Sequence, residues 1–260
     1  MNSILEWLKL PQNEGIKNLN DPAATIRHAE IIRNKKILRN IYIDFYNQFR
    51  KSLDQSSLDG VVVELGSGGG FIQEVIPNVR RSDILQIPTI DLCFSAERVP
   101  FKSNSVDAFL MIDVFHHIKE PVLLIKEFER CLKKNGRIVM IEPANTLWGR
   151  FVYSNFHHEN FNPKAGWSIE GHGPMSDANG ALPWIIFCRD RKMFKSQFDN
   201  IQLEKVAFHT PFCYLVSGGL SMRQLLPSFM YPLVRGFEIL LTPFNPLFGM
   251  FMTIHLRKLI

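Results

Sequence analysis

The clearest hydrophobic pattern in the chain is a short apolar run that leads into a cluster of glycines. Residues 61–63 are three valines, Glu64 follows them, and residues 66–70 read Gly-Ser-Gly-Gly-Gly. Apolar side chains on both faces are typical of a buried strand, and glycine lets the backbone turn sharply and approach a ligand closely. The apolar spacing of residues 71–75 predicts that a helix begins there. Together these features predict a strand, a glycine turn and a helix, with a ligand at the carboxyl end of the strand.

Strand and helix patterns alternate through the next part of the chain. Apolar runs predict strands at residues 79–84, 90–94, 105–113 and 137–143, and an amphipathic pattern predicts a helix over 120–133. Beyond an interruption, a helix over 189–198 and strands over 201–208 and 250–257 complete the alternation. Strands that alternate with helices indicate an α/β fold with a largely parallel sheet.

Three segments lie outside this alternation. Residues 22–53 carry apolar side chains at helical spacing after the cap and first-turn pair Asp21-Pro22. Residues 144–188 read as an irregular segment crowded with aromatic residues and histidines, which predicts a cap over the ligand site. Residues 209–249 are rich in Phe, Leu and Pro and predict an apolar helical hairpin. Because prolines interrupt the apolar runs before 18 residues, no membrane span is expected.

Composition narrows the class of protein. The 260 residues are 46% hydrophobic, which favours one domain with insertions over two domains. The net charge of +5 predicts a mild attraction to anionic membranes. Because the basic residues are scattered, no nucleic-acid-binding arm is predicted. The four cysteines form no Cys-x-x-Cys pair, and residues 1–15 lack the apolar core of a signal peptide. We therefore expect a cytoplasmic protein with buried thiols and without zinc.

The glycine cluster excludes two common nucleotide-binding motifs. A dinucleotide fingerprint needs a glycine at its sixth position, where Phe71 stands, and a P-loop needs a Gly-Lys-Ser/Thr ending that is missing here. The remaining pattern is acid-x-Gly-x-Gly-x-Gly, from Glu64 to Gly70. An acid without a nearby lysine or arginine suits a cationic amino-acid ligand. Since an acid past the second strand is where a nucleotide ribose is bound, Asp83 is the predicted ribose acid.

This pattern resembles motif I of the class I S-adenosylmethionine (SAM)-dependent methyltransferases, in the methyltransferase type 11 and ubiquinone-menaquinone methyltransferase-like group. Later motifs extend the resemblance over residues 61–143 in the family's order. They are Ser95-Ala96-Glu97 with Val99-Pro100-Phe101, strand 105–113 with His116-His117, and Leu132-Lys133-x-x-Gly136-Arg137 before Glu142-Pro143. The resemblance implies a Rossmann-like, seven-stranded, mostly parallel sheet with helices on both faces and an antiparallel pair of strands six and seven. Residues 1–260 would then form one domain around a SAM-binding core at 61–143.

The resemblance also implies which residues bind SAM. The expected set is Glu64, Gly66, Ser67, Gly68, Gly70, Asp83, Ser95, Ala96, Asp113 and Val114. Ser95 replaces the family's adenine-binding aspartate, so adenine recognition is expected to depend more on the backbone of Ala96. Asp113 is expected to face the methionine portion, and residues 22–53 to lie across the mouth of the site. Side chains there that could reach the SAM carboxylate, or equally form a solvated helix face, are Arg33, Lys36, Tyr42 and Tyr46.

Histidines supply the candidates for catalysis. His116 and His117 follow the fourth strand near the expected methyl group, and they could act on the acceptor or brace the loop's backbone. His157, Glu159 and His172 of the cap could deprotonate an acceptor hydroxyl. Because the adjacent His157 and His158 of the cap cannot easily share one ion, no metal is expected.

These features predict methyl transfer from SAM to a small-molecule or lipid-linked acceptor, with S-adenosylhomocysteine (SAH) as the product. O-methylation in polysaccharide or secondary-metabolite biosynthesis is the first choice, because the histidines and tryptophans of the cap suit a polyhydroxylated ligand. The open alternatives are a C-methyltransferase of quinone-like substrates, a SAM-binding protein without catalysis, and a nicotinamide-dependent oxidoreductase. Residues 209–249 could add core, form a homodimer face or contact a membrane peripherally, and nucleic acid is not an expected partner.

Overall fold

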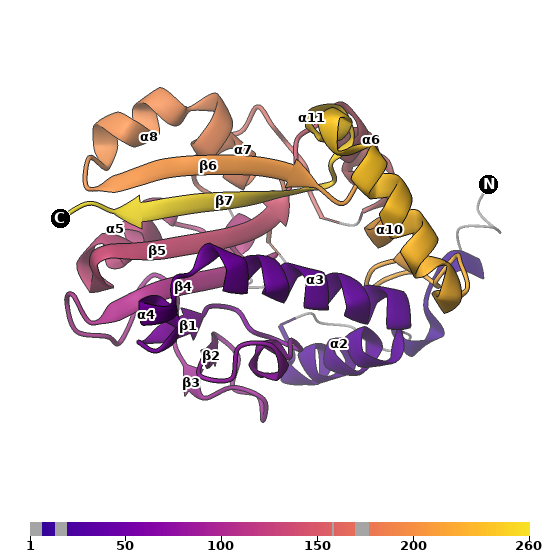
Figure 1. The fold of residues 1–260 in the computed structure, drawn as a ribbon, viewed down its shortest axis with the longest axis horizontal. Helices are drawn as coiled ribbons and strands as arrows, with labels where there is room; N and C mark the ends of the chain where they lie inside the picture. Colours follow the sequence, from indigo (N-terminus) through magenta and orange to yellow (C-terminus); the bar gives the residue numbers. More distant parts are fainter. Residues whose placement is uncertain (1–6, 14–19, 158, 170–176) are drawn as a thin grey trace.

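A seven-stranded sheet forms the centre of the molecule. The computed structural model describes residues 7–13, 20–157, 159–169 and 177–260. The strand order is β3-β2-β1-β4-β5-β7-β6 (Figure 1). The strands are β1 (Val62–Glu64), β2 (Arg80–Asp83), β3 (Leu92–Cys93), β4 (Val106–Ile112), β5 (Leu132–Pro143), β6 (Ile201–His209) and β7 (Phe251–Lys258). Strands β1 to β5 pair in parallel, whereas β7 is antiparallel to both β5 and β6. The predicted Rossmann-like class, with its antiparallel last pair, is confirmed.

Helices cover both faces of this sheet. They are α2 (Pro22–Asn34), α3 (Lys36–Ser52), α4 (Gln55–Leu58), α5 (Pro121–Cys131), α6 (Leu147–Phe156), α7 (Leu182–Trp184), α8 (Arg191–Gln197), α9 (Cys213–Ser217), α10 (Tyr231–Leu240) and α11 (Asn245–Phe248). Alternate residues of β4 serve opposite faces, as the pleat requires. Ala108 and Leu110 pack in a core cluster with α2 and α3, while Phe109 and Met111 pack in a second cluster with α5, α7 and α8.

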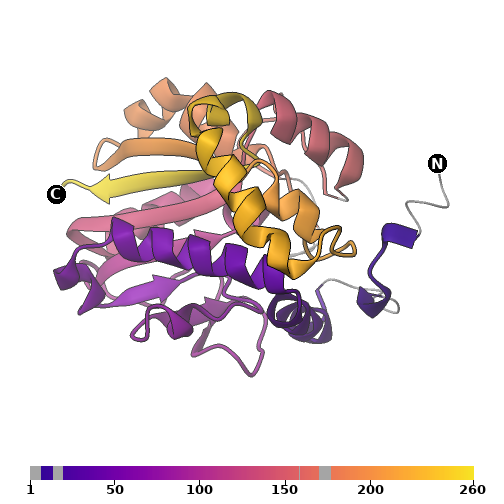
Figure 2. The same cartoon turned by 45° about the vertical axis from the view of Figure 1, so that its right-hand side comes forward.

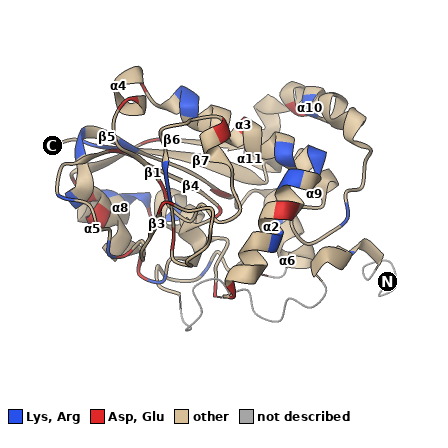
Figure 3. Ribbon diagram, turned by 90° about the horizontal axis from the view of Figure 1, so that it is seen from below, with Lys and Arg blue, Asp and Glu red and all other residues tan. Residues whose placement is uncertain are grey.

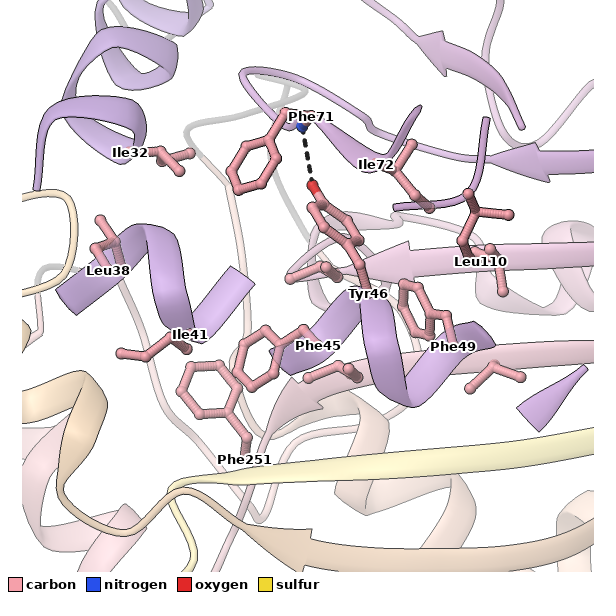
Figure 4. Packing of buried hydrophobic residues seen from close by; sticks show 14 of the residues in the cluster. Ile32, Leu38, Ile41, Phe45, Tyr46, Phe49, Phe71, Ile72, Leu110 and Phe251 are labelled. Atoms are coloured by element: carbon pink, nitrogen blue, oxygen red, sulfur yellow. Dashed lines mark hydrogen bonds between the residues drawn. The ribbon is translucent and has the colours of Figure 1, made fainter. Parts of the chain in front are cut away.

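The two N-terminal helices form because caps and apolar spacing favour them. Asp21 caps α2 by accepting a hydrogen bond from Ala23 N at 2.9 Å, and Pro22 begins the helix. The buried side chains of α3 recur at helical spacing and are Ile37, Leu38, Ile41, Phe45, Tyr46 and Phe49. Figure 4 shows Tyr46 directed at the glycine turn, where its hydroxyl accepts a hydrogen bond from Phe71 N at 3.1 Å. Helix α3 therefore holds the turn in place.

The prediction of an α-helix directly after the glycine turn is wrong in both the type and the length of the element. The structure has a single 3₁₀ turn, η2 (Ile72–Glu74), before β2 begins at Arg80. Pro77 follows the turn closely; it has no N–H for the helical ladder and disfavours a helical residue before it. The β1–β2 connection therefore contains the glycine turn and one 3₁₀ turn in place of an α-helix.

The cap expected to be irregular over 144–188 contains a regular helix, α6. Thr146 caps it, because its Oγ1 accepts a hydrogen bond from Gly149 N at 2.9 Å. Val152 and Tyr153 are buried on one side of the helix. Helix α7 and a π-helical turn, η4 (Ile185–Arg189), end the segment before α8. The crowd of aromatic residues hid this amphipathic pattern in the sequence.

The apolar segment between β6 and β7 is a series of short helices instead of a hairpin. Helices α9, α10 and α11 are separated by the 3₁₀ turns η5 (Ser228–Met230) and η6 (Thr242–Phe244). Proline stands in the first turn of α10, η6 and α11, where it starts each helix but prevents a longer one. None of the described helices is both long and apolar enough to cross a membrane. Figures 1 and 2 show α6, α10 and α11 together at the edge of the sheet where β5 and β6 end.

Candidate functional site

The glycine turn after β1 is shaped by contacts that only glycine allows. Gly66 and Gly68 have positive φ angles of 61° and 48°, a conformation that L side chains rarely adopt. A Cβ at Gly66 would collide with the side chain of Val114, and one at Gly70 would lie 2.5 Å from the Tyr46 hydroxyl. The turn therefore fits between the loop after β4 and helix α3.

The first of two adjoining cavities lies beside β2. It encloses about 330 Å³ and its lining includes Gly66, Gly68, Asp83, Ser95, Ala96, Asp113, Val114 and His117. Asp83 ends β2, and its carboxylate accepts hydrogen bonds from Gly68 N (3.0 Å) and Leu85 N (2.9 Å). Burial raises the pKa of Asp83. The structure thus brings the predicted ribose acid and the predicted adenine-binding residues to the wall of one cavity.

The second cavity encloses about 500 Å³ and lies on the other side of the turn. Its wall includes Glu64, the glycines of the turn, residues of α2 and α3, part of the cap and the loop after β6. Both cavities reach Gly66, Gly68, Asp113 and His117. A single elongated ligand can therefore extend from one cavity into the other.

Two carboxyl groups on the wall of the second cavity have raised pKa values. Burial raises the pKa of Glu64 to about 8 and that of Asp113 to about 7. Glu64 is 2% exposed, and its Oε2 atom has no hydrogen-bond partner among the described residues. Asp113 follows β4 with a φ of 55°, a strained value that is often found at functional sites. A buried acid that lacks a partner fits the cationic amino-acid portion of the expected ligand.

A buried acid from β5 holds the loop after β4. Glu142 Oε1 accepts hydrogen bonds from Val114 N (3.0 Å) and Phe115 N (2.7 Å), and Oε2 lies 2.7 Å from His116 Nδ1. The other ring nitrogen of His116 lies 3.3 Å from Glu159 Oε2. Burial opposes a charged imidazole, but the two carboxylates raise the pKa of His116 well above its usual value. His116 is therefore an imidazolium that joins the cap to the sheet, which favours the bracing interpretation for this histidine.

His117 faces the cavities in the opposite protonation state. Its Nδ1 lies 3.3 Å from the carbonyl oxygen of Asp177, and its Nε2 lies 3.6 Å from Glu159 Oε1. Burial and the neighbouring His116 imidazolium lower the pKa of His117 to about 4. When Nδ1–H of the neutral ring donates to the carbonyl, Nε2 is the acceptor. Of the two histidines, His117 has the geometry that suits a base.

The four side chains expected near a ligand carboxylate separate into two groups. Tyr42 and Tyr46 line the second cavity. Arg33 instead donates hydrogen bonds to two backbone carbonyl oxygens of the glycine turn, at 3.3 and 3.5 Å. Lys36 lines neither cavity. The two tyrosines therefore stay candidates for ligand contact, while Arg33 supports the turn.

The cap places two of its three candidate bases in the second cavity. His157 and Glu159 line it, with His157 Nδ1 3.7 Å from Glu159 Oε2, whereas His172 lies outside the described residues. Ligand atoms of His116, His117 and Glu159 lie within 4.8 Å of one another and could hold a metal ion. The expectation of no metal concerns the adjacent His157 and His158 of the cap, and His158 lies outside the described residues. The absence of a metal stays a prediction.

The loop after β6 forms a part of the wall that the sequence did not indicate. Residues 214–215 and 218–222 line the second cavity. Gly218 and Gly219 have φ angles of 71° and 50°, and the side chain of Lys35 donates to the carbonyl oxygens of Gly219 (2.5 Å) and Met222 (2.7 Å). The Gly-Gly pair was the available signal, but nothing in the sequence related it to the distant turn after β1.

Comparisons with known proteins agree with this geometry. A model of the methyltransferase domain matches residues 63–140, from β1 into β5. A comparison with curated proteins found no match. Among solved structures, geranyl diphosphate C-methyltransferase from Streptomyces coelicolor A3(2), in complex with Mg²⁺, geranyl-S-thiolodiphosphate and SAH, has a TM-score of 0.50 at 14% identity over 93% of this chain and 84% of that chain. A SAM-dependent methyltransferase from Thermotoga maritima has a TM-score of 0.49 at 15% identity, over 84% of this chain and 89% of that one. The matched segment contains the glycine turn, Asp83, Asp113 and both histidines. Residues 63–140 therefore match a methyltransferase domain, and this match supports SAM as the cofactor.

Proposed function

We propose that the protein transfers the methyl group of SAM to a hydroxyl oxygen of a small-molecule or lipid-linked acceptor, of the kind used in polysaccharide or secondary-metabolite biosynthesis. The observation that carries the proposal is the position of His117. Its Nε2 lies 3.6 Å from Glu159 Oε1, on the wall that also contains Asp113 and the glycine turn. Since both atoms accept hydrogen bonds, a hydroxyl placed beside them would donate to one of them.

The chain's own residues can align this hydroxyl and remove its proton. Bound SAM supplies a methyl group on a positively charged sulfur. As the new O–C bond formed and the C–S bond broke, the hydroxyl proton would become strongly acidic, so a weak base would be sufficient. His117, with a pKa of about 4, is neutral at physiological pH and takes this proton at Nε2. Glu159 is kept ionised against the effect of burial by the hydrogen bond from His116, which lowers its pKa, and it orients the hydroxyl.

The second cavity favours an acceptor with an apolar part. Apolar and aromatic cap residues on its wall are Val152, Tyr153, Phe156 and Phe161. No tryptophan of the described residues lines it. The indole N–H groups of Trp148 and Trp167 donate to other parts of the fold, each at 2.9 Å. The tryptophans therefore give no support to a purely polyhydroxylated acceptor, and we propose a hydroxyl carried by a molecule with a hydrophobic portion.

Transfer of a labelled methyl group tests this function. The protein would be incubated with tritium-labelled SAM and either a lipid extract or a polar metabolite extract of cells. We expect label in the lipid fraction, in a product identified as a methyl ether by mass spectrometry. Calorimetric titration with SAH, with NADH as a control, tests the cofactor separately, and Asp83→Ala should weaken the binding of SAH. Binding of SAH without transfer to either extract would favour a non-catalytic SAM-binding protein.

Binding of SAH is expected to release protons at about pH 6.5. In the free protein Glu64, with a pKa of about 8, and Asp113, with a pKa of about 7, are largely protonated there. The ligand's ammonium group favours the carboxylates and lowers both pKa values, so affinity should rise with pH up to about 8. Calorimetry in buffers of different ionisation enthalpy counts the protons. Glu64→Gln should lower the number of protons released on binding. Glu74→Gln should leave this number unchanged, because Glu74 forms an exposed ion pair with Arg39. Equal proton counts in wild type and Glu64→Gln would contradict this assignment.

A further inference from the structure

Helix α10 has its charged residues inside and its apolar residues outside. Glu238 is 2% exposed, and its Oε1 accepts hydrogen bonds from Phe212 N (2.8 Å) and Cys213 N (2.7 Å). Arg235 points to the same side, where it pairs with Asp44 (3.1 Å) and with Glu238 (3.2 Å). The side chains on the opposite side are Leu233, Phe237 and Leu240, which are 68%, 53% and 76% exposed. A surface helix normally has the reverse arrangement, so this helix is built to face something apolar.

The exposed apolar side chains of α10 continue onto neighbouring elements. We call the combined surface the apolar face; it consists of Leu147, Phe151, Phe156, Leu225, Phe229, Leu233, Phe237, Ile239, Leu240, Phe244, Leu247 and Phe248. Ring contacts join its two halves. Trp148 stacks on Phe151 with ring centroids 5.7 Å apart and contacts Phe212 at 6.0 Å, and Phe212 contacts Phe237 at 5.9 Å. The apolar face is therefore one continuous surface formed by α6, η5, α10, η6 and α11.

The charge around the apolar face favours a lipid bilayer as its partner. Between residues 224 and 250 no exposed residue is charged, and Thr242 is the single exposed one with a polar side chain. A protein partner would normally meet a rim of polar and charged groups. The exposed Arg150 and Arg223 lie close in the chain to Phe151 and Leu225 of the face, and Arg223 lies over the ring of Trp7 at 5.7 Å. Figure 3 shows α6 and α10 drawn mostly in the colour of uncharged residues. An uncharged apolar surface bordered by arginine and tryptophan suits the interface of an anionic membrane.

The apolar face is continuous with the second cavity. Phe156 belongs to both, since it is 46% exposed and also lines the cavity, and its neighbours Val152 and Tyr153 line the cavity from the same helix. Residues 214–215 and 218–222 line the cavity, and Leu225 of the apolar face follows them closely in the chain. A hydroxyl beside His117 could therefore belong to a molecule whose apolar part extends past Phe156 to the surface.

We propose that the apolar face rests on an anionic lipid bilayer, with α10 lying in the membrane interface, and that the acceptor reaches His117 from that bilayer. The helices are short and have proline in their first turn, so they would lie on a membrane without crossing it. The delivery of the acceptor from the bilayer rests on the proposed function, whereas the docking of the apolar face does not depend on methyl transfer.

Vesicle flotation tests the docking. The full chain would be mixed with phosphatidylcholine vesicles, with and without phosphatidylglycerol, and the fraction that floats would be measured at low and high salt. Wild type is expected to float with the anionic vesicles, and Leu233→Ser with Phe237→Ser to reduce its partition at least tenfold. Leu123→Ser with Met193→Ser is the matched control, because these exposed side chains lie on α5 and α8, away from the face. The control should float like wild type.

Three results would decide against the proposal. The first is wild type that stays in solution with anionic vesicles at low salt. The second is a loss of flotation in the control variant, Leu123→Ser with Met193→Ser, that equals the loss in Leu233→Ser with Phe237→Ser. The third is a dimer in sedimentation velocity that the Leu233→Ser and Phe237→Ser substitutions separate, which would make a second copy the partner. Calorimetric binding of SAH to every variant shows that it is folded. Loss of flotation with intact SAH binding therefore concerns the docking alone, and flotation without methyl transfer would leave the docking proposal standing while the proposed function failed.

Discussion

Replacing His117 with alanine is expected to lower kcat by about 10²- to 10⁴-fold, the usual contribution of a general base. The binding of SAH should change little, because Glu64, Asp83 and Asp113 stay in place on the two cavities. The reason is geometric: Nε2 of His117 lies 3.6 Å from Glu159 Oε1, on the wall that the two cavities share. Single-turnover methyl transfer at saturating SAM, measured together with calorimetric binding of SAH, separates the two effects.

His157→Ala provides the matched control for this substitution. His157 also lies near Glu159, at 3.7 Å, but its side chain is more exposed than that of His117 (29% against 11%). We expect it to lower kcat much less. If His157→Ala were as slow as His117→Ala, the result would indicate that the base is His157 of the cap.

The pH profile distinguishes a base from a residue that only shapes the pocket. His117, with its pKa of about 4, is neutral over the usual range, so kcat of the wild type at saturating SAM should be flat from about pH 6 to 8. With a histidine base of unperturbed pKa, kcat would instead rise with pH along a limb centred at about pH 6.5. Such a limb in the wild type, absent from His117→Gln, would show that burial and the imidazolium of His116 do not lower the pKa of this base.

The parts of the site that could be predicted from the sequence are those that a local pattern specifies. The glycine turn, the acid before it and the acid that ends the second strand each depend on a few adjacent residues, and topology alone brings them to one edge of the sheet. The structure places Glu64, Asp83 and Asp113 on the walls of the two cavities as the pattern indicates. The prediction of a helix after the turn was wrong, because Pro77, which is also a local signal, outweighed the apolar spacing.

The parts that could not be predicted depend on tertiary contacts. In the sequence Glu142 is only half of a Glu-Pro pair, yet it contacts the loop 26 to 28 residues before it and raises the pKa of His116. The orientation of α10 is a second case. Its apolar content is visible in the sequence, but its outward direction follows from Glu238 and Arg235 pairing inward, with partners from α3 and the start of α9. Neither partner lies at a spacing that a sequence pattern reports.

Replacing Glu142 with glutamine is expected to destabilise the folded protein by about 3 to 5 kcal/mol, because it leaves a buried imidazolium with one of its two carboxylates missing. The glutamine oxygen can still accept hydrogen bonds from Val114 and Phe115, so the loss reports on the charge of His116. Chemical denaturation near about pH 6 measures it, and the melting temperature should fall by about 2–4 °C per kcal/mol. Glu204→Gln is the control: this carboxylate pairs with Arg137 (2.9 Å) and Arg257 (2.8 Å) at the surface, and its loss should cost about 1 kcal/mol or less.

The pH dependence of this difference follows from the raised pKa of His116. A group that is more basic when folded contributes its full stabilisation below its unfolded pKa, near about 6.5, and loses it as the pH rises through the folded value. The gap between wild type and Glu142→Gln should therefore be largest in mildly acidic solution and narrow in alkaline solution. A gap that widens with pH would mean that His116 is neutral in the fold. In that case Glu159 would lose the charge that keeps it ionised, and burial alone would lower the pKa of His117, so the same measurement tests the electrostatic basis of the proposed base.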